Sequence, residues 1–299
     1  MTQSLINGLV DNQLNAFDRG LNYGDGLFET IAIRNGKPLL WDAHIERMSK
    51  GAQRLAIPFE QQTRNALLSD FNTLCARHSP ANHVFDGVLK FVLTRGVGPR
   101  GYKAQVQPDL TRIASISAIS DNTAAQKTGI SVVLCATQLA RQPLLAGIKH
   151  LNRLEQVLAR NEWACSRIGE GIVSDTQGFV IEGCMSNLFW VTDNVLYTPD
   201  LTHAGVEGVV RNAIIKLCQL KQLMTVKIGD FTLADVLSAD EVFVCNSVVN
   251  ILPVTNIYDV ASAVSDVITD TQGWPKVLAV GAKTQQLQSL LDHFYLEGN

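Results

Sequence analysis

The chain has 299 residues, and its 25 Lys and Arg against 28 Asp and Glu give a formal net charge of −3. This balance excludes the broad positive field that binding to nucleic acid or an anionic membrane requires. Apolar residues make up 46% and charged residues 18% of the chain, which excludes a disordered chain and predicts a large core in two domains or one large α/β unit.

The first third of the chain mixes strand and helix patterns. In chain order, we predict a strand at 26–33, a helix at 43–57, and strands at 88–94 and 113–119. The first strand ends at the Asn35-Gly36 turn signal, and the helix ends before Pro58 because a proline disfavours helical backbone in the residue before it.

Small polar residues at 120–128 predict a linker, which separates an N-terminal domain (1–119) from a C-terminal domain (129–299). In the second half we predict a strand at 130–137, a helix at 151–165, a hairpin of 171–175 and 179–182, a strand at 186–192, a helix at 207–220, a strand at 241–245 and a helix at 274–295. Strands and helices alternate in both halves, so two α/β domains are expected.

Several common kinds of site have no matching pattern. The sequence contains no phosphate loop, no G-x-S-x-G elbow and no H-E-x-x-H pair. Its six cysteines are scattered without a C-x-x-C pair, and no apolar run approaches the roughly 18 residues of a spanning helix. We therefore expect no metal, no membrane span and no secretory signal, and a cytoplasmic protein with reduced thiols that binds a small molecule.

Lys149 is the first candidate for chemistry. It follows the mostly apolar run LLAGI and precedes the predicted amphipathic helix. A solvated surface lysine is the simpler interpretation, but apolar neighbours favour an uncharged amine that acts as nucleophile and base.

Glu182 and the helix predicted at 207–220 supply further candidates. Glu182 closes an apolar strand, where it either starts a turn or points inward and needs a cationic partner such as a pyridinium nitrogen. The backbone N–H groups of Val209 and Val210, at the start of the helix, are suited to bind a phosphate.

Together with Arg47, these residues match the needs of pyridoxal phosphate: an amine for its aldehyde, an acid for its ring nitrogen, and donors for its phosphate. Six motifs extend the pattern: DRG (18–20), YGDGLFET (23–30), AHIERM (43–48), RGVGPRGY (95–102), AGIKHLNRLEQVLAR (146–160) and CNSVVNILPV (245–254). In this order they resemble fold-type-IV pyridoxal-phosphate enzymes, which include branched-chain and D-amino-acid aminotransferases and aminodeoxychorismate lyases. The resemblance implies a smaller N-terminal α/β sandwich and a larger C-terminal α/β pseudobarrel.

The resemblance also implies a role for each matched residue. Lys149 binds the cofactor covalently and moves protons, while Glu182 keeps the ring nitrogen protonated. Phosphate binding is implied for Arg47, Val209, Val210 and Ser247, and a structural role in the turn after Glu182 for Asn187. Thr30, Arg100 and Asn246 are candidates to contact substrate, although a strand residue, a solvated loop arginine and a local backbone cap are the respective alternatives.

The segment after Lys149 is similar to that of the lyases in the group. This implies the elimination of pyruvate from 4-amino-4-deoxychorismate to give 4-aminobenzoate, in a homodimer. The alternatives are a branched-chain or D-amino-acid aminotransferase of the same fold, and a binding protein that has the fold but no cofactor.

Overall fold

The structure is a computed structural model, and it describes residues 3–11, 13–78, 85–260 and 274–296. It divides into two compact units: unit 1 comprises Met1–Ser120 and Ile148–Asn152, and unit 2 comprises Asp121–Gly147 and Arg153–Asn299. The five residues of Ile148–Asn152, which the sequence placed in the second domain, therefore group with unit 1. Within the predicted linker, Thr123–Thr128 form the short helix α4.

Unit 1 contains a six-stranded antiparallel sheet in the order β2-β1-β6-β5-β3-β4. Its strands are β1 (Gln3–Ile6), β2 (Leu9–Val10), β3 (Gly26–Arg34), β4 (Lys37–Pro38), β5 (Gly87–Thr94) and β6 (Thr111–Ser117). The strands predicted at 26–33, 88–94 and 113–119 are confirmed as β3, β5 and β6. In β3 the side chains of Leu27, Glu29 and Ile31 are buried, whereas Phe28 and Thr30, on the opposite face, are half-buried.

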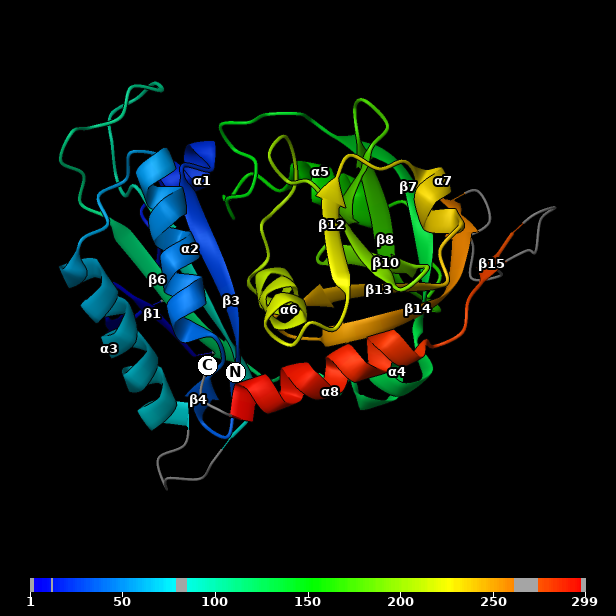
Figure 1. Cartoon of the computed structure of the whole chain (residues 1–299). Coiled ribbons are helices and arrows are strands. Elements are labelled where there is room, and N and C mark those ends of the chain that lie inside the picture. The colour runs from blue at the N-terminus through cyan, green and yellow to red at the C-terminus, as the bar shows by residue number, and fades with distance from the viewer. Residues whose placement is uncertain (1–2, 12, 79–84, 261–273, 297–299) are drawn as a thin grey trace. The chain divides into compact units, whose positions relative to one another are not determined.

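Three helices accompany this sheet: α1 (Arg19–Tyr23), α2 (Trp41–Arg54) and α3 (Gln61–His78). Helix α2 packs on β3, and α3 packs on β1 and β6 (Figure 1). The two helices meet where the rings of Trp41 and Phe71 lie 5.8 Å apart. The predicted helix at 43–57 is thus confirmed as α2, and it presents His44, one turn before Arg47, to the core.

Unit 2 contains a nine-stranded mixed sheet in the order β12-β11-β10-β13-β14-β7-β8-β9, with β15 paired to β14. Its strands are β7 (Ile130–Leu139), β8 (Ile168–Asp175), β9 (Val180–Gly183), β10 (Asn187–Thr192), β11 (Val195–Pro199), β12 (Thr225–Gly229), β13 (Glu241–Asn246), β14 (Asn250–Asp259) and β15 (Lys276–Val277). The terminal strand β9 contacts β10 and β11, although four strands separate β9 from β10 in the sheet order. The sheet therefore curls into a half-barrel, as the pseudobarrel prediction requires.

The remaining helices of unit 2 are α5 (Leu154–Arg160), α6 (Val209–Leu220), α7 (Leu233–Leu237) and α8 (Ala282–Leu296). Helix α6 packs on β12, β13 and α8, and α8 packs on β13 and β14 (Figure 1). These contacts place the first turn of α6 beside the half-barrel.

Two predicted helices of unit 2 are too long. The helix predicted at 151–165 is wrong at both ends, because Leu151 donates a backbone hydrogen bond to Gly26 and Trp163 turns into the core after α5 has ended. The helix predicted at 274–295 begins only at Ala282, because Lys276 and Val277 pair with β14 instead. In both segments the helical spacing of apolar residues extends into residues whose backbone pairs with a strand instead of forming a helix.

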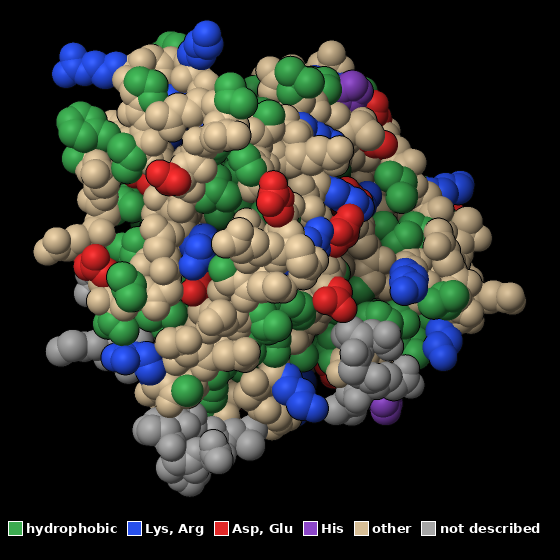
Figure 2. All heavy atoms as spheres, turned by 90° about the vertical axis from the view of Figure 1, so that its left-hand side faces the viewer, with side chains coloured by type: hydrophobic (Ala, Val, Ile, Leu, Met, Phe, Trp, Pro, Cys, Tyr) green, Lys and Arg blue, Asp and Glu red, His purple; other side chains and the backbone are tan. Residues whose placement is uncertain are grey.

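Charges are interspersed on the face shown in Figure 2, where neither Lys and Arg nor Asp and Glu gather into one patch. None of the helices formed by the described residues combines the length and hydrophobicity needed to cross a bilayer. In the same part of the chain, no group of three or more His, Cys, Asp or Glu side chains is placed to hold a metal ion.

Candidate active site

Lys149 lies in unit 1, in a segment that pairs with β3. Phe28 donates its N–H to the carbonyl of Lys149 at 3.0 Å, and Leu151 donates to the carbonyl of Gly26 at 3.0 Å. The side chain of Lys149 is half-buried, and its Nζ lies 4.4 Å from the centroid of the Phe28 ring. The amine of Lys149 therefore packs against the Phe28 ring, which differs from a fully solvated surface lysine.

Thr30 follows Phe28 by two residues, so both side chains lie on the same face of β3. In the register of the sheet, Thr30 lies opposite Lys90 of β5. The strand thus brings a hydroxyl group to the face against which the amine of Lys149 is held. Thr30 as a residue that contacts substrate stays a prediction.

Arg47 takes part in a buried cluster that the sequence did not reveal. Its Nε donates to Oε1 of Glu29 at 2.8 Å, and its Nη2 donates to Oε2 at 2.5 Å. His44 donates from Nδ1 to the same Oε2 at 2.6 Å, since an ionised carboxylate can only accept. The phosphate-binding candidate Arg47 is therefore held in a fixed direction by Glu29.

Electrostatics explain how Glu29 remains charged while fully buried. Burial alone would raise its pKa, but the Arg47 guanidinium and the hydrogen bond from His44 outweigh this and lower the pKa to about 2. Burial lowers the pKa of His44, and although the charge and hydrogen bond of Glu29 raise it, the positive charges of Arg47 and Lys149 lower it again, so the pKa stays below its usual value. The ring is consequently neutral, and the carboxylate is balanced by one arginine.

Glu182 lies on β9 in unit 2 and is only 4% exposed. Its Oε2 accepts a hydrogen bond from the backbone N–H of Val206 at 2.8 Å. Gly205 precedes that N–H with a φ of +84°, and a Cβ there would lie 2.7 Å from Ile181. Glu182 therefore points inward, which was one of its two interpretations, and Gly205 allows the backbone to approach it.

The N-terminus of α6 lies next to the Val206 contact. Helix α6 begins at Val209, and its N-cap residue Gly208 offers no side-chain hydrogen bond to the first turn. Asn187 donates from Nδ2 to the carbonyl of Val206 at 2.8 Å. The first N–H groups of a helix need an acceptor, and this helix start, with Val209 and Val210, suits an anion.

Asn246 is the last residue of β13, and Ser247 is the first residue of the turn that leads to β14. Oδ1 of Asn246 accepts from the N–H groups of Val248 and Val249 at 2.8 and 2.9 Å. Its Nδ2 donates to the carbonyl of Met185, in the turn after Glu182, at 3.1 Å. These bonds give Asn246 the role of a backbone cap, while the half-buried Ser247 follows it in the turn.

The predicted site residues fall into two groups. Unit 1 holds Thr30, Arg47, Arg100 and Lys149, and unit 2 holds Glu182, Val209, Val210, Asn246 and Ser247. Sequence reasoning missed Glu29 and His44 as partners of Arg47, although both lie in quoted motifs. An acidic residue at a position that alternates with buried Leu27 and Ile31 is the signal that would have found Glu29.

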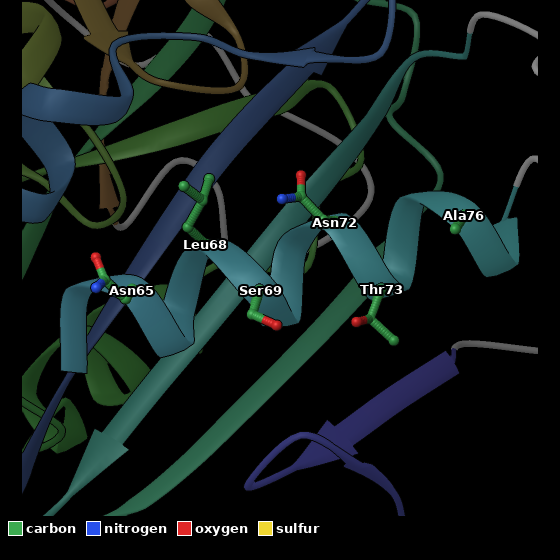
Figure 3. A pocket seen from close by; sticks show the side chains of 6 residues that line it. All are labelled: Asn65, Leu68, Ser69, Asn72, Thr73 and Ala76. Carbon is green, nitrogen blue, oxygen red and sulfur yellow. The ribbon is translucent and has the colours of Figure 1, made fainter. Parts of the chain in front are cut away.

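A hollow of about 470 Å³ lies along the surface of α3 (Figure 3). It is lined by Asn65, Leu68, Ser69, Asn72, Thr73 and Ala76, all from that helix. None of these is a predicted site residue, and none can ionise. This hollow carries no chemistry of the kind described above.

The chain belongs to the class IV amino-transferase family, whose sequence model matches residues 26–257. Among its relatives, the aminodeoxychorismate lyase of Vibrio harveyi is 37% identical over 254 residues, which cover 84% of the chain and 90% of the relative. The D-alanine aminotransferase of Listeria innocua is 31% identical over 252 residues, covering 83% of each.

Solved structures give the same family. The 4-amino-4-deoxychorismate lyase of Pseudomonas aeruginosa is 38% identical with a TM-score of 0.84, and the match covers 97% of the chain and 98% of that protein. A hypothetical aminotransferase of Mycobacterium tuberculosis in its PLP-bound form shares the fold at 19% identity, with a TM-score of 0.76 over 99% and 100% of the two chains. The fold-type-IV class expected from the motifs is confirmed.

Proposed function

We propose that the chain is a 4-amino-4-deoxychorismate lyase, which eliminates pyruvate from its substrate to form 4-aminobenzoate, a step towards folate. The structural observation that carries the proposal is the pairing of residues 148–152 with β3, which holds the Lys149 amine on the strand face that bears Thr30. The similarity to two lyases, at 37% and 38% identity over most of the chain, favours this reaction over the others of the family.

Each unit, taken by itself, holds groups that pyridoxal phosphate needs. Lys149 would bind it covalently, Glu182 would pair with its ring nitrogen, and the N–H groups of Val209 and Val210 would bind its phosphate. Ser247 would add a hydroxyl donor, and Arg47, oriented by Glu29, would add a guanidinium. When bound, the cofactor accepts electron density from a broken C–H bond, and the negative charge of Glu182 supports this by keeping the ring nitrogen protonated.

The chain's own groups then have defined tasks. The Lys149 amine would be freed when the substrate's own amine takes its place on the cofactor, and would then remove the proton from the substrate carbon that bears the amino group. Thr30 faces the reacting carbons with its hydroxyl, and Arg100 pairs with a substrate carboxylate. Substrate binding by Asn246 stays a prediction, because both polar atoms of its side chain bond to backbone groups in the structure. Loss of the enolpyruvyl oxygen from the neighbouring carbon makes the product ring aromatic, which favours elimination.

Amino transfer is the second candidate, because a D-alanine aminotransferase is 31% identical over 83% of the chain. The two reactions share the first proton removal. In the lyase reaction a leaving group is then eliminated from the neighbouring carbon, whereas in amino transfer the cofactor carbon is protonated and hydrolysis follows. Purified protein should form 4-aminobenzoate and pyruvate in equal amounts from 4-amino-4-deoxychorismate, and should transfer amino groups from D- or branched-chain amino acids to 2-oxoglutarate far more slowly. The opposite ranking would assign the chain to the aminotransferases.

Exposed apolar side chains support a homodimer as part of this proposal. On α5, Leu154 is 77%, Val157 50% and Leu158 60% exposed. A second copy of the chain would cover this face, since a monomer seldom leaves three neighbouring apolar side chains in water. All six cysteines are free, which supports the reducing cytoplasm as the location.

A further inference from the structure

The glycine-rich loop that contains Arg100 is held by Arg19, about 80 residues earlier in the chain. Nη1 of Arg19 donates to the carbonyl of Gly101 at 2.9 Å, and Nη2 donates to the carbonyl of Tyr102 at 3.0 Å. Arg19 itself is only 4% exposed. Its planar guanidinium thus binds the carbonyls of two successive residues of the loop.

Other contacts fasten the same loop to α1. The Arg19 guanidinium lies 4.9 Å from the ring centroid of Tyr23, whose hydroxyl accepts from the N–H of Gly101 at 3.2 Å. The side-chain stem of Arg19 runs so close to Gly98 that a Cβ there would lie 2.8 Å from Cδ of Arg19. The loop is therefore shaped around this one side chain.

Asp25 fixes Arg19 from the other side and is shared with a second arginine. Its Oδ2 accepts from Nε of Arg19 at 2.9 Å and from Nε of Arg95 at 2.8 Å. Partial burial would raise the pKa of Asp25, but the two arginines lower it, so the carboxylate is charged at neutral pH. Nη2 of Arg95 also donates to Oδ1 of Asp25 at 3.1 Å. Its other bonds go to the carbonyls of Leu55 and Ala56 after α2, so it holds a different segment.

Arg100 lies directly before Gly101 and Tyr102, whose carbonyls Arg19 binds, and its side chain is exposed. Within the described part of the chain, its guanidinium has no ion-pair partner. A loop with three glycines among residues 96–101 samples many conformations unless it is anchored. Anchoring it in advance lowers the entropy cost when Arg100 binds an anion.

We propose that Arg19 is the positioning residue of the Gly98–Tyr102 loop, and that it sets the affinity for the substrate carboxylate through Arg100. The substrate part rests on the proposed function, in which Arg100 binds that carboxylate. The DRG and RGVGPRGY motifs thereby have one shared task, which is to present a single guanidinium to the substrate.

The test compares Arg19→Lys with the matched control Arg95→Lys in the full-length protein loaded with cofactor. Both variants lose a buried guanidinium bound to Asp25, but only the first loses the grip on the loop. Because Tyr102 is 87% exposed, chymotryptic cleavage after this residue, followed by mass spectrometry, reports how firmly the loop is held. We expect Arg19→Lys to accelerate this cleavage and to raise KM by about tenfold each, with kcat within about twofold of the native value.

The control should change neither quantity by more than about twofold, because Arg95 bonds to the carbonyls of Leu55 and Ala56 and not to the loop carbonyls. Equal acceleration and equal KM in the two variants would overturn the proposal, because the effect would then reflect general loosening of unit 1. If Arg19→Lys does not fold, Tyr23→Phe removes the acceptor of the Gly101 N–H alone and should shift cleavage and KM in the same direction by about threefold.

The link to substrate is tested in an Arg100→Gln background. There, Arg19→Lys should still accelerate cleavage but should no longer raise KM. If Arg100→Gln leaves KM unchanged, the substrate part of the proposal is overturned. That failure is distinguishable from failure of the proposed function, which is decided by the formation of 4-aminobenzoate in the native protein.

Discussion

Glu29 is a single buried charge whose partners all come from one helix. Its carboxylate accepts from Arg47 and His44, one turn apart on α2. The lowered pKa, from 4.5 to about 2, corresponds to roughly 3 kcal/mol of folding stability at neutral pH. This stability is fully present above the unfolded pKa and is lost as the pH falls towards 2.

Glu29→Gln should therefore lower the free energy of unfolding at pH 7 by about 3 kcal/mol, since it also leaves Arg47 without its counter-charge. The difference from the native protein should shrink steadily between pH 5 and pH 2. Urea unfolding at several pH values measures this difference. Asp86→Asn is the matched control, because its ion pair with Arg34 is about 40% exposed at both ends and should cost less than about 1 kcal/mol. A Glu29→Gln deficit that stays constant down to pH 3 would contradict this account.

Candidate site residues could be predicted from the sequence only where the residue type itself indicates a chemical role. Lys149, Glu182 and Arg47 were proposed because their types match a cofactor's needs, and in the structure each of these side chains has a defined contact. Glu29 was missed because its partners lie 15 or more residues away in sequence, and Arg19 because the loop that it binds lies about 80 residues away. The folded backbone alone brings them together.

The start of α6 is the element on which the proposed phosphate binding depends. An ideal Cβ on Gly208 would lie 1.8 Å from Oδ1 of Asn187, whose Nδ2 binds the carbonyl of Val206. Val206 in turn donates its N–H to Glu182. A side chain at position 208 would therefore disturb both the helix start and the carboxylate beside it.

Gly208→Ala should cost about 1–3 kcal/mol of stability, because the methyl group has no room. It should also reduce the preference for pyridoxal phosphate over pyridoxal by about tenfold, since that preference measures phosphate binding alone. Titration of each compound, followed by absorbance, gives the ratio. Gly229→Ala serves as control, because its Cβ would meet only Phe231 at 3.4 Å, an ordinary contact. An unchanged ratio in Gly208→Ala would show that the phosphate binds elsewhere.

Helices and strands could be predicted from the sequence pattern where all residues of the segment belong to one secondary-structure element. The run GLFETIAI, which ends at the Asn35-Gly36 turn signal, predicted β3, and this strand packs against α2. The helix at 151–165 was predicted too long because its apolar residues serve three tasks: pairing with β3, the helix α5, and the core around Trp163. Periodicity does not separate such tasks.

The family-level architecture was predictable from the order of motifs, and both sheets agree with it. The grouping of residues 148–152 with unit 1 was not, since it depends on backbone hydrogen bonds to Gly26 and Phe28. Hydrogen bonds between backbone groups, such as those that join residues 149 and 151 to β3, do not show in the pattern of side chains along the sequence. Lys149, the lysine of the proposed reaction, consequently belongs to a different unit from the one its neighbours in sequence suggest.

Assembly into a dimer is a prediction for the molecule as a whole. Leu158→Lys, on the exposed apolar face of α5, should halve the molar mass measured by light scattering after gel filtration, because a charge resists burial in the interface. Leu220→Lys changes an equally exposed leucine at the end of α6 and should leave the mass unchanged. A native protein that is already monomeric at micromolar concentration would contradict the prediction.

The most direct test of the central claim is to map where the cofactor binds covalently. Full-length protein is incubated with excess pyridoxal phosphate, reduced with borohydride, digested and analysed by mass spectrometry. The account predicts one modified residue, Lys149, and no modification at that site in Lys149→Ala, with Lys127→Ala on the surface helix α4 labelled like the native protein. A protein that stays unlabelled, or that carries the label on another lysine, would contradict the assignment of Lys149 and the reaction built on it.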